Sequence, residues 1–182
     1  MILSKVFWFT GLSGVGKTTV ANSVKDFFEQ KGYRVLVLDG DNVRQELHQH
    51  LGFSPSEIKR NNLLIAKLCQ KHRCENDIIF VPIISPYRES RSLVRSMLRP
   101  GFYEIHFDAD IEILCQRDTK GLYAMAQQGK MDNLIGVSGK NVYEAPVEPD
   151  FYINTGTMSE EEATKSFKKF VASKMDVKAM RI

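Results

Sequence analysis

The sequence contains few cysteines and no long apolar run. Its three cysteines are Cys69, Cys74 and Cys115. An odd number without a C-x-x-C pair favours neither a disulfide framework nor a zinc site, so we expect reduced thiols and a cytoplasmic location. No stretch approaches the roughly 18 apolar residues of a membrane span, and the opening MILSKVFWFTG is too short and too soon polar for a signal peptide. We therefore expect no association with a membrane.

A strong excess of either charge is also missing. Lysine and arginine number 25 and the acidic residues 22, which leaves a net charge of +3. This small excess does not indicate nucleic-acid binding, because the phosphates of one small ligand would neutralise it. The 182 residues, 43% apolar and 26% charged, have the ordinary composition of a single globular domain spanning 1–182.

Apolar segments alternate with helical patterns along the chain. Buried strands are expected at Lys5–Thr10, Tyr33–Leu38, Ile78–Ile84, Tyr103–Phe107 and Phe151–Asn154. Helices are expected at Lys17–Gln30, from the capping box Ser54-Pro55-Ser56-Glu57 onward, and from the capping box Ser159-Glu160-Glu161-Glu162 to about Ser173. This alternation predicts an α/β fold of three layers, in which helices cover both faces of a mostly parallel five-stranded sheet.

A phosphate-binding motif follows the first expected strand. Residues 11–18 read GLSGVGKT, a complete match to G-x-x-x-x-G-K-[ST] between a strand and a helix. The loop amides would bind the phosphates of ATP, Lys17 would reach the β- and γ-phosphates, and the Thr18 hydroxyl would ligate Mg²⁺. The expected ATP-binding residues of this motif are Gly11, Leu12, Ser13, Gly14, Val15, Gly16, Lys17, Thr18 and Thr19. The motif predicts a P-loop NTPase fold.

The P-loop by itself does not separate GTPases, ATPases and nucleotide kinases. The sequence has no N-K-x-D, the motif with which GTPases read guanine; the nearest string, Ser173-Lys174-Met175-Asp176, is more typical of a solvated terminus. The strand Ile78–Ile84 is followed by Ser85-Pro86 rather than by the acidic residue of a mechanical ATPase. Asp39 and Asp41, after the second strand, are therefore the best candidates for metal binding and catalysis.

Further motifs accompany the P-loop in a characteristic order. They are Asp39-Gly40-Asp41-Asn42-Val43-Arg44, Leu51-Gly52-Phe53-Ser54, Ile84-Ser85-Pro86-Tyr87-Arg88, Arg117-Asp118-Thr119-Lys120-Gly121-Leu122-Tyr123 and Tyr143-Glu144-Ala145-Pro146. Over about 6–155 the chain resembles the adenylyl-sulfate (APS) kinase family, which has a nucleoside-kinase-like P-loop fold. The resemblance implies transfer of the ATP γ-phosphate to the ribose 3′-hydroxyl of a small nucleotide acceptor, with Mg²⁺ as cofactor. It also implies a homodimer and a mobile lid at about 119–141.

The resemblance further implies roles for individual residues. Asp41 would hold the acceptor hydroxyl or a Mg²⁺ water and accept the proton late, while Lys17 and Lys120 would neutralise developing charge. Arg117 would stack on the ATP adenine. The expected substrate-binding residues are Asp41, Arg44, Phe53, Asn61, Ile84, Ser85, Lys120, Leu122 and Ile135, and the expected metal ligands are Thr18, Asp39 and Asp41.

The sequence departs from the family on the acceptor side. Ile58 stands where the family has a substrate-binding arginine, and Leu63 and Leu64 replace an arginine pair. Leu134-Ile135-Gly136-Val137 replaces the family's F-T-G-I, so Phe53 is the remaining half of an aromatic clamp. A lost arginine–anion contact costs about 1.5–3 kcal/mol, and a lost base stack costs about 1–3 kcal/mol. Sequence drift that leaves the acceptor unchanged is the alternative explanation.

These departures predict a different acceptor for the same reaction. The first candidate is a nucleoside 5′-diphosphate-like compound with a smaller base and a neutral terminal group, such as the cytidine 5′-diphosphoramidate of bacterial capsule pathways. A true adenylyl-sulfate kinase is the alternative substrate assignment, and a non-catalytic nucleotide-binding regulator is the alternative class.

The remaining histidines and the basic tail give weaker signals. His48-Gln49-His50 has the wrong helical spacing for a metal pair and is expected on the surface, and His72 and His106 are isolated. The tail at 165–181 is basic with interleaved apolar residues, and a helix packed on the protein's own sheet is preferred to membrane or nucleic-acid binding.

Overall fold

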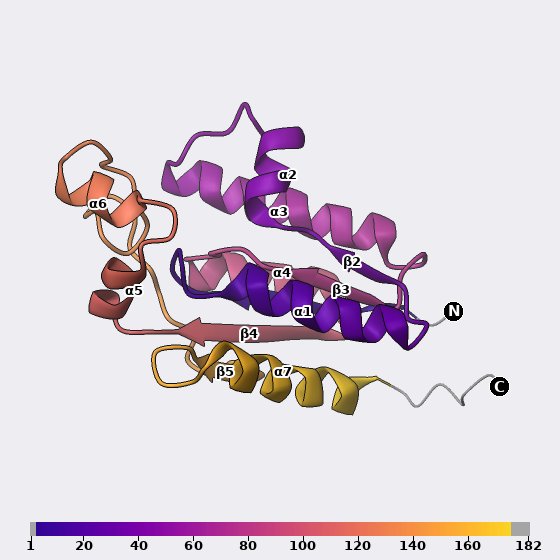
Figure 1. The fold of residues 1–182 in the computed structure, drawn as a ribbon. Helices are drawn as coiled ribbons and strands as arrows, with labels where there is room; N and C mark the ends of the chain where they lie inside the picture. Colours follow the sequence, from indigo (N-terminus) through magenta and orange to yellow (C-terminus); the bar gives the residue numbers. More distant parts are fainter. Residues whose placement is uncertain (1–2, 176–182) are drawn as a thin grey trace.

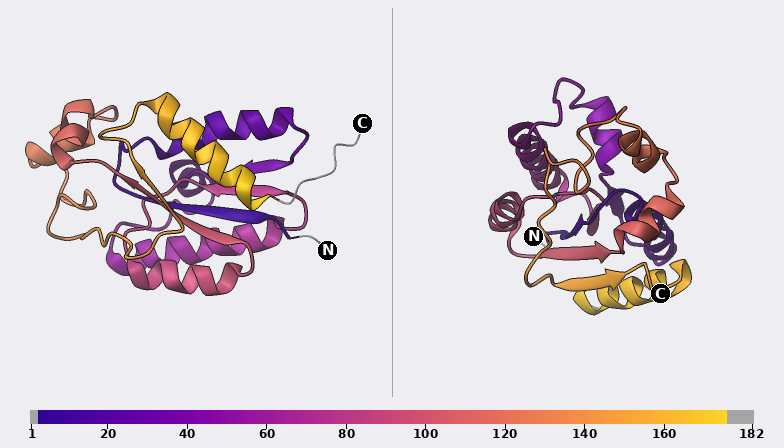
Figure 2. Two further views of the ribbon diagram at one scale, coloured as in Figure 1. Left: turned by 90° about the horizontal axis from the view of Figure 1, so that it is seen from below. Right: turned by 90° about the vertical axis from the view of Figure 1, so that its left-hand side faces the viewer.

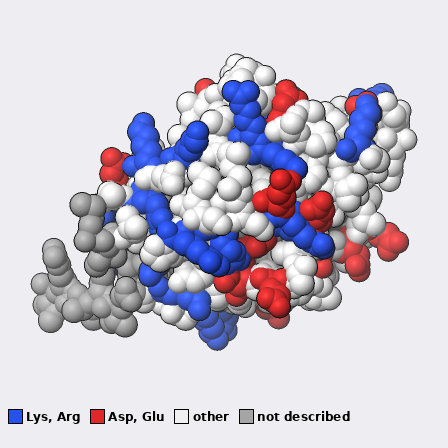
Figure 3. Space-filling model, turned by 180° about the vertical axis from the view of Figure 1, so that it is seen from behind, with Lys and Arg blue, Asp and Glu red and all other residues white. Residues whose placement is uncertain are grey.

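The computed structural model describes residues 3–175 and forms one α/β unit (Figure 1). The first two residues of the chain, and the part of the basic tail at 176–181, lie outside the described residues. Among the described residues, none of the helices is both long and apolar enough to cross a membrane. Seen from behind, the surface carries basic and acidic side chains next to one another (Figure 3), as the small net charge suggests.

A five-stranded sheet forms the centre of the described structure, as expected. Its strands are β1 (Lys5–Thr10), β2 (Val35–Val37), β3 (Ile78–Val81), β4 (Phe102–Asp108) and β5 (Phe151–Asn154). The order is β2-β3-β1-β4-β5, and all four pairings are parallel. The third strand ends three residues earlier than expected, because Pro82 has no N–H to donate to a neighbouring strand.

Helices cover both faces of the sheet. They are α1 (Lys17–Gln30), α2 (Gly40–Glu46), α3 (Pro55–His72), α4 (Arg88–Leu98), α5 (Ile111–Arg117), α6 (Leu122–Gln127) and α7 (Glu160–Lys174). Helices α1 and α7 lie together on one face and α3 and α4 on the other, while α5 and α6 lie beyond the carboxyl end of β4 (Figures 1 and 2). The three layers predicted from the sequence are confirmed.

The central strand β1 explains why both faces are covered. Phe7 and Phe9 belong to the apolar core under α1 and α7, whereas Val6 and Trp8 belong to the core under α3 and α4. All four side chains are fully buried. A strand that alternates between two apolar cores has to be covered on both sides.

The helix starts expected from capping boxes are confirmed. The Ser54 hydroxyl accepts from the backbone N–H of Glu57, and Ser159 does the same with Glu162. Helix α4 was not among the expected helices, because half of its buried residues are polar and its apolar residues Val94, Met97 and Leu98 come only in its second half. Those polar residues include Arg91, whose partners lie on other elements.

Candidate active site

The carboxyl ends of the parallel strands border a cleft of about 290 Å³. This position, outside the carboxyl edge of an open α/β sheet, is where such folds bind ligands. The predicted site residues that line the cleft are Ser13, Gly14, Val15, Gly16, Lys17, Thr18, Thr19, Asp39, Asp41, Arg44, Phe53, Asn61, Ile84, Ser85, Lys120 and Ile135. Most of the residues selected from the sequence are therefore brought to one place.

The P-loop has the backbone that its glycines allow. At Gly11 a Cβ atom would lie 2.4 Å from the carbonyl oxygen of Phe107, so a side chain does not fit. Gly16 adopts a left-handed conformation with φ of 88° as the N-cap of α1. These two positions let the loop turn closely against β4 and enter the helix.

Lys17 is buried inside this loop. Its Nζ donates to the carbonyl oxygens of Gly11 at 2.8 Å and of Leu12 at 2.7 Å. Burial, and secondarily the positive charge of Lys120, lower the pKa of Lys17 to about 7. Gly11 and Leu12 do not line the cleft themselves; they contribute the two carbonyls that hold the lysine.

The candidate metal-binding residues lie against the start of α1. The Thr18 hydroxyl donates to Asp39 Oδ2 at 2.8 Å, and Asp39 Oδ1 accepts from the backbone N–H of Asp41 at 3.0 Å. Asp41 in turn accepts from Lys120 Nζ, and both side chains are more than half exposed. The described residues contain no cluster of three or more acidic, histidine or cysteine side chains. One hydroxyl and two carboxylates nevertheless fit Mg²⁺, which keeps several waters and nucleotide oxygens as ligands.

A second cavity, of about 210 Å³, lies on the other side of the P-loop. Gly16 and Thr19 line both cavities, and Arg117 lines only this one. Arg117 Nη2 donates to the carbonyl oxygen of Thr155 at 2.7 Å. The position beside the P-loop suits the predicted contact of Arg117 with the base of a nucleotide.

Arg44 and Phe53 form one edge of the acceptor half of the cleft. The Arg44 guanidinium lies 4.5 Å from the centre of the Phe53 ring, and its Nη1 donates to the carbonyls of Leu51 and Gly52. Partial burial lowers the pKa of Arg44, against the opposing effect of nearby carboxylates. Arg44 thereby supports the loop that holds Phe53, whose ring stays 47% exposed.

The expectation that His48 lies on the surface is wrong. Its side chain is buried, and the ring Nδ1 is 2.8 Å from Asn61 Oδ1. This contact with Asn61 of α3 joins residues 13 positions apart, which the short sequence string could not reveal. With Oδ1 engaged in this way, the amide N–H groups of Asn61 remain for the cleft.

The residues that depart from the family divide into two groups. Ile58 and Ile135 pack together with Tyr87 in a small apolar cluster and line the cleft. Leu63 packs in the core under α3 and α4, and Leu134 packs in the core under α1 and α7, so neither lines the cleft. The acceptor half therefore has an apolar wall made of two buried isoleucines.

Lysine or arginine near Ile58 does not compensate for it. Arg60 is exposed and does not line the cleft, as its helical position predicts. Lys59 forms an ion pair with Glu89 and lies 5.6 Å from the centre of the Tyr87 ring. Neither Lys59 nor Arg60 therefore brings a positive charge to the cleft wall at Ile58.

Ser85 lies at the base of the cleft in an unusual conformation. Its φ is 44°, a left-handed value that costs a residue other than glycine about 1–3 kcal/mol. Its carbonyl oxygen accepts from Thr10 Oγ1 at 3.1 Å and from Arg91 Nη1 at 2.7 Å. Its hydroxyl oxygen accepts from Trp8 Nε1 and from Asn62 Nδ2, both at 3.0 Å. Four hydrogen bonds thus hold one strained residue in place.

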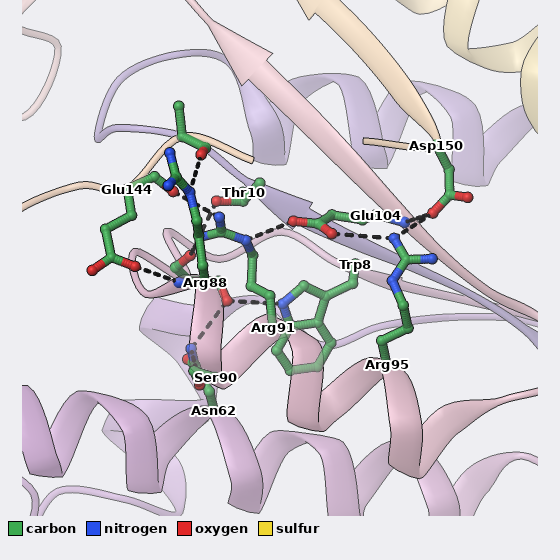
Figure 4. A network of polar contacts seen from close by, with 12 residues as sticks. Trp8, Thr10, Asn62, Arg88, Ser90, Arg91, Arg95, Glu104, Glu144 and Asp150 are labelled. Carbon is green, nitrogen blue, oxygen red and sulfur yellow. Dashed lines mark hydrogen bonds and ion pairs between the residues drawn. The ribbon is translucent and has the colours of Figure 1, made fainter. Parts of the chain in front are cut away.

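Arg91, which donates to the Ser85 carbonyl, is the first residue of a chain of ion pairs with Glu104, Arg95 and Asp150 (Figure 4). Arg91 Nε donates to Glu104 at 2.6 Å, and Arg95 donates to Glu104 at 3.1 Å and to Asp150 at 2.7 Å. The Arg91 side chain is only 2% exposed. Sequence analysis identified none of Trp8, Asn62 and Arg91. Asn62 left one signal, because it is an asparagine on the buried, otherwise mainly apolar face of α3.

The predicted lid contains more anchors than its composition suggested. Leu122, expected to bind substrate, packs on the core at the start of α6 and does not line the cleft. The Tyr123 hydroxyl donates to the carbonyl of Ser13 at 2.8 Å. Asn141 donates to the carbonyl of Phe53 and accepts from the hydroxyl of Tyr87. The segment therefore contacts both the P-loop and the acceptor half.

Known proteins share both the sequence and the structure of this chain. Residues 3–154 match the adenylylsulphate kinase family. An adenylyl-sulfate kinase of Halothermothrix orenii is 42% identical over 171 residues, 92% of this chain and 89% of the relative. One of Bacillus pumilus is 38% identical over 173 residues, 94% and 86% of the two chains. The Mycobacterium tuberculosis APS kinase, solved with AMPPNP and APS, superposes with a TM-score of 0.88 at 32% identity, covering 94% of this chain and 99% of that one.

These matches extend over nearly the whole chain and agree with the geometry of the cleft. The cleft contains a P-loop with its lysine and an acidic pair after β2. Its acceptor half has polar residues and an apolar wall. The chain belongs to the adenylylsulphate kinase family and is a P-loop phosphotransferase whose acceptor is an alcohol group.

Proposed function

We propose that this enzyme uses ATP and Mg²⁺ to phosphorylate the ribose 3′-hydroxyl of a nucleotide, and that adenylyl sulfate is its acceptor. The observation that carries the proposal is the placement of Lys17, Asp41 and Lys120 in one cleft with Arg44 and Phe53. The names of the relatives support adenylyl sulfate, as does the neighbouring structure that holds APS beside an ATP analogue.

On the ATP side, the loop amides and Lys17 bind the phosphates, and Arg117 contacts the base in the second cavity. Thr18, Asp39 and Asp41 would hold Mg²⁺, which when bound would supply the positive charge that neutralises the β- and γ-phosphates. The pKa of Lys17 is about 7 in the free protein. Because the phosphates are negatively charged, their binding stabilises the ammonium form of Lys17.

On the acceptor side, Asp41 orients the 3′-hydroxyl and accepts its proton as the bond to the γ-phosphorus forms and the bond from that phosphorus to the β–γ bridging oxygen breaks, which releases ADP. Lys120, which contacts Asp41 in the structure, neutralises charge that develops on the transferred group. Phe53 stacks on the acceptor base, while Asn61 and Ser85 donate hydrogen bonds to the acceptor. Of the predicted substrate-binding residues, Leu122 alone does not line the cleft, so its position does not support a contact with the acceptor.

One observation favours a second acceptor, cytidine 5′-diphosphoramidate. The wall formed by Ile58 and Ile135 offers no charge to a sulfate and no aromatic surface to a purine. A neutral amide needs no cation there, and a pyrimidine needs less stacking surface than adenine. The two isoleucines belong to one apolar cluster, so they form a continuous surface rather than two isolated replacements.

The experiment compares kcat/KM for adenylyl sulfate and for cytidine 5′-diphosphoramidate, with phosphorus NMR to locate the new phosphate. A value of about 10⁴ M⁻¹s⁻¹ or more for adenylyl sulfate supports the first acceptor. Turnover of the cytidine compound with little turnover of adenylyl sulfate replaces the first acceptor with the second. Phosphate on a position other than the 3′-hydroxyl contradicts both.

We also infer a single-domain, cytoplasmic enzyme that forms a homodimer and closes residues 119–141 over its substrates. Cys69, Cys74 and Cys115 are free thiols, which suits a reducing compartment. Light scattering after size-exclusion chromatography measures the mass in solution, and a monomer at micromolar concentration would contradict the homodimer.

A further inference from the structure

The hydroxyl of Ser85 has an unusually complete set of partners. Trp8 Nε1 and Asn62 Nδ2 both donate to its oxygen, each at 3.0 Å. Trp8 is fully buried in β1, Asn62 is buried in α3, and Ser85 itself is 2% exposed. The close-up shows the indole of Trp8 beside Arg91, with Asn62 approaching from α3 (Figure 4).

The chemistry of a hydroxyl group restricts what Ser85 can do. A hydroxyl oxygen has two lone pairs and one proton. Here an N–H group points at each lone pair, so the proton has to lie along the remaining direction. Ser85 and Asn62 both line the cleft, whereas Trp8 is fully buried and does not line it.

The backbone around Ser85 keeps this arrangement in place. The carbonyl oxygen of Ser85 is held by Thr10 and by Arg91, and Arg91 is itself fixed by Glu104. Asn62 Nδ2 also contacts Ser90 Oγ at 3.2 Å, which fixes the plane of the amide. The side chain therefore has little freedom to exchange its partners.

We propose that Trp8 and Asn62 orient the Ser85 hydroxyl as a hydrogen-bond donor to a phosphate oxygen of the acceptor, which makes Asn62 a positioning residue for acceptor binding. Phosphate oxygens only accept, and a donor held in advance binds them without a loss of rotamer freedom. This inference rests on the proposed function, because it concerns the acceptor half of the same cleft.

Asn62→Asp is the sharpest variant, since it keeps the shape and replaces a donor by an acceptor. The ionised carboxylate of this variant takes the Ser85 proton for itself. Asn62→Leu, whose side chain neither donates nor accepts, is the second variant. It is needed because a protonated carboxyl group in Asn62→Asp could still donate to Ser85. Asn76→Asp is the matched control; Asn76 lies past the opposite end of α3, and its Nδ2 donates to the carbonyl of His72 away from the cleft.

The measurement is the KM of whichever of adenylyl sulfate and cytidine 5′-diphosphoramidate the wild type turns over. We expect Asn62→Asp and Ser85→Ala each to raise it about tenfold, the equivalent of one hydrogen bond, with the KM for ATP within about twofold. In the Ser85→Ala background, Asn62→Asp should add nothing further, because the group that it orients is gone. Asn76→Asp should leave the acceptor KM unchanged.

An unchanged acceptor KM in both Asn62 variants would overturn the proposal. A double variant of Asn62→Asp and Ser85→Ala whose acceptor KM rises by the product of the two single effects would also overturn it. If the wild type turns over neither acceptor, the proposed function fails separately. Binding is then followed by the emission of Trp8, the single tryptophan of the sequence, with AMPPNP saturating and adenosine or cytidine 5′-phosphate as the probe. Weaker binding to Asn62→Leu than to wild type supports the proposal. Equal binding, or none to wild type, overturns it.

Discussion

Lys17 is buried inside the P-loop, away from water. Burial lowers its pKa to about 7, so at pH 8 the ligand-free protein holds it mostly as the neutral amine. ATP phosphates stabilise the ammonium form, and binding at pH 8 should therefore take up a proton. At pH 6 the lysine is already mostly charged, and the uptake should be much smaller.

Calorimetry of ATP binding in two buffers of different ionisation enthalpy measures this uptake. The predicted result is a buffer-dependent enthalpy at pH 8 and a much smaller dependence at pH 6. Equal proton uptake at the two pH values would show that Lys17 is charged in the free protein.

Asp41 separates an enzyme from a nucleotide-binding regulator. Loss of a group that orients and deprotonates the hydroxyl should lower kcat about 10²–10⁴-fold in Asp41→Ala. ATP should still bind, because Lys17 and the loop amides are intact. A coupled assay of ADP release gives the rate, and Asp26→Ala on the exposed side of α1 is the control. ADP release by Asp41→Ala at the wild-type rate would remove Asp41 from the mechanism.

His48 acts on the cleft through Asn61. His48→Phe keeps most of the ring volume and loses the hydrogen bond to Asn61 Oδ1. The amide is then free to rotate, and we expect the acceptor KM to rise about fivefold to tenfold while the KM for ATP stays constant. His50→Phe, at an exposed position in the same string, is the matched variant. Equal acceptor KM values in the two variants would contradict the role of His48.

The limits of sequence analysis are clearest at this scale. The P-loop and Asp41 were recognisable because their residues are contiguous and their order is characteristic. The partners of Ser85 were not, since Trp8 and Asn62 lie 77 and 23 residues away from it along the chain. The packing of β1, α3 and β3 on one another decides which N–H group donates to which oxygen. A local sequence pattern does not predict such hydrogen bonds.

At the scale of elements, the apolar strands and the capped helices were predictable from the sequence. Each has a local cause: a run that alternates between two cores, or a side chain that satisfies its own helix end. Helix α4 has apolar residues at helical spacing only in its second half, no side chain caps its start, and Ser90 and Arg91 occupy the buried face of its first half. A polar side chain is buried only where a partner exists, and the partner of Arg91 lies on β4. The burial of its first turn therefore depends on a partner that is distant in the sequence.

The lid at 119–141 also belongs to this scale. Its anchors include the hydrogen bond from Tyr123 to the P-loop carbonyl of Ser13 and the contacts of Asn141 with Phe53 and Tyr87. Since ligands on both sides of the cleft would reinforce these contacts, amide exchange across the segment should slow when AMPPNP and acceptor are added. Tyr123→Phe should speed exchange in the free protein. Strong and equal protection with and without ligands would show a rigid segment and no lid.

At the scale of the whole molecule, the sheet separates two kinds of stabilisation. One face is an aromatic core under α1 and α7, where Phe7, Phe9 and Phe167 pack together. The other face combines apolar packing with the ion pairs that reach Ser85. The three-layer architecture was predictable from the apolar strands. The ion pairs of Arg91 and Arg95 with Glu104 and Asp150 were seen only in the structure.

The buried ion pair between Arg91 and Glu104 gives the last prediction. Glu104→Ala leaves the guanidinium of Arg91 buried without its carboxylate, and such a loss costs about 3–5 kcal/mol of the free energy of unfolding. Glu89→Ala removes the exposed pair with Lys59 and should cost less than about 1 kcal/mol. Urea denaturation at pH 7 measures both.

Because Arg91 also holds the carbonyl of Ser85, Glu104→Ala should raise the acceptor KM under conditions in which the variant is still folded. The KM for ATP should change little, since neither Arg91 nor Glu104 is hydrogen-bonded to a residue of the P-loop. A Glu104→Ala variant as stable as Glu89→Ala would mean that water reaches Arg91 in solution. A loss of stability with an unchanged acceptor KM would mean that the strained turn at Ser85 is held without the ion pair.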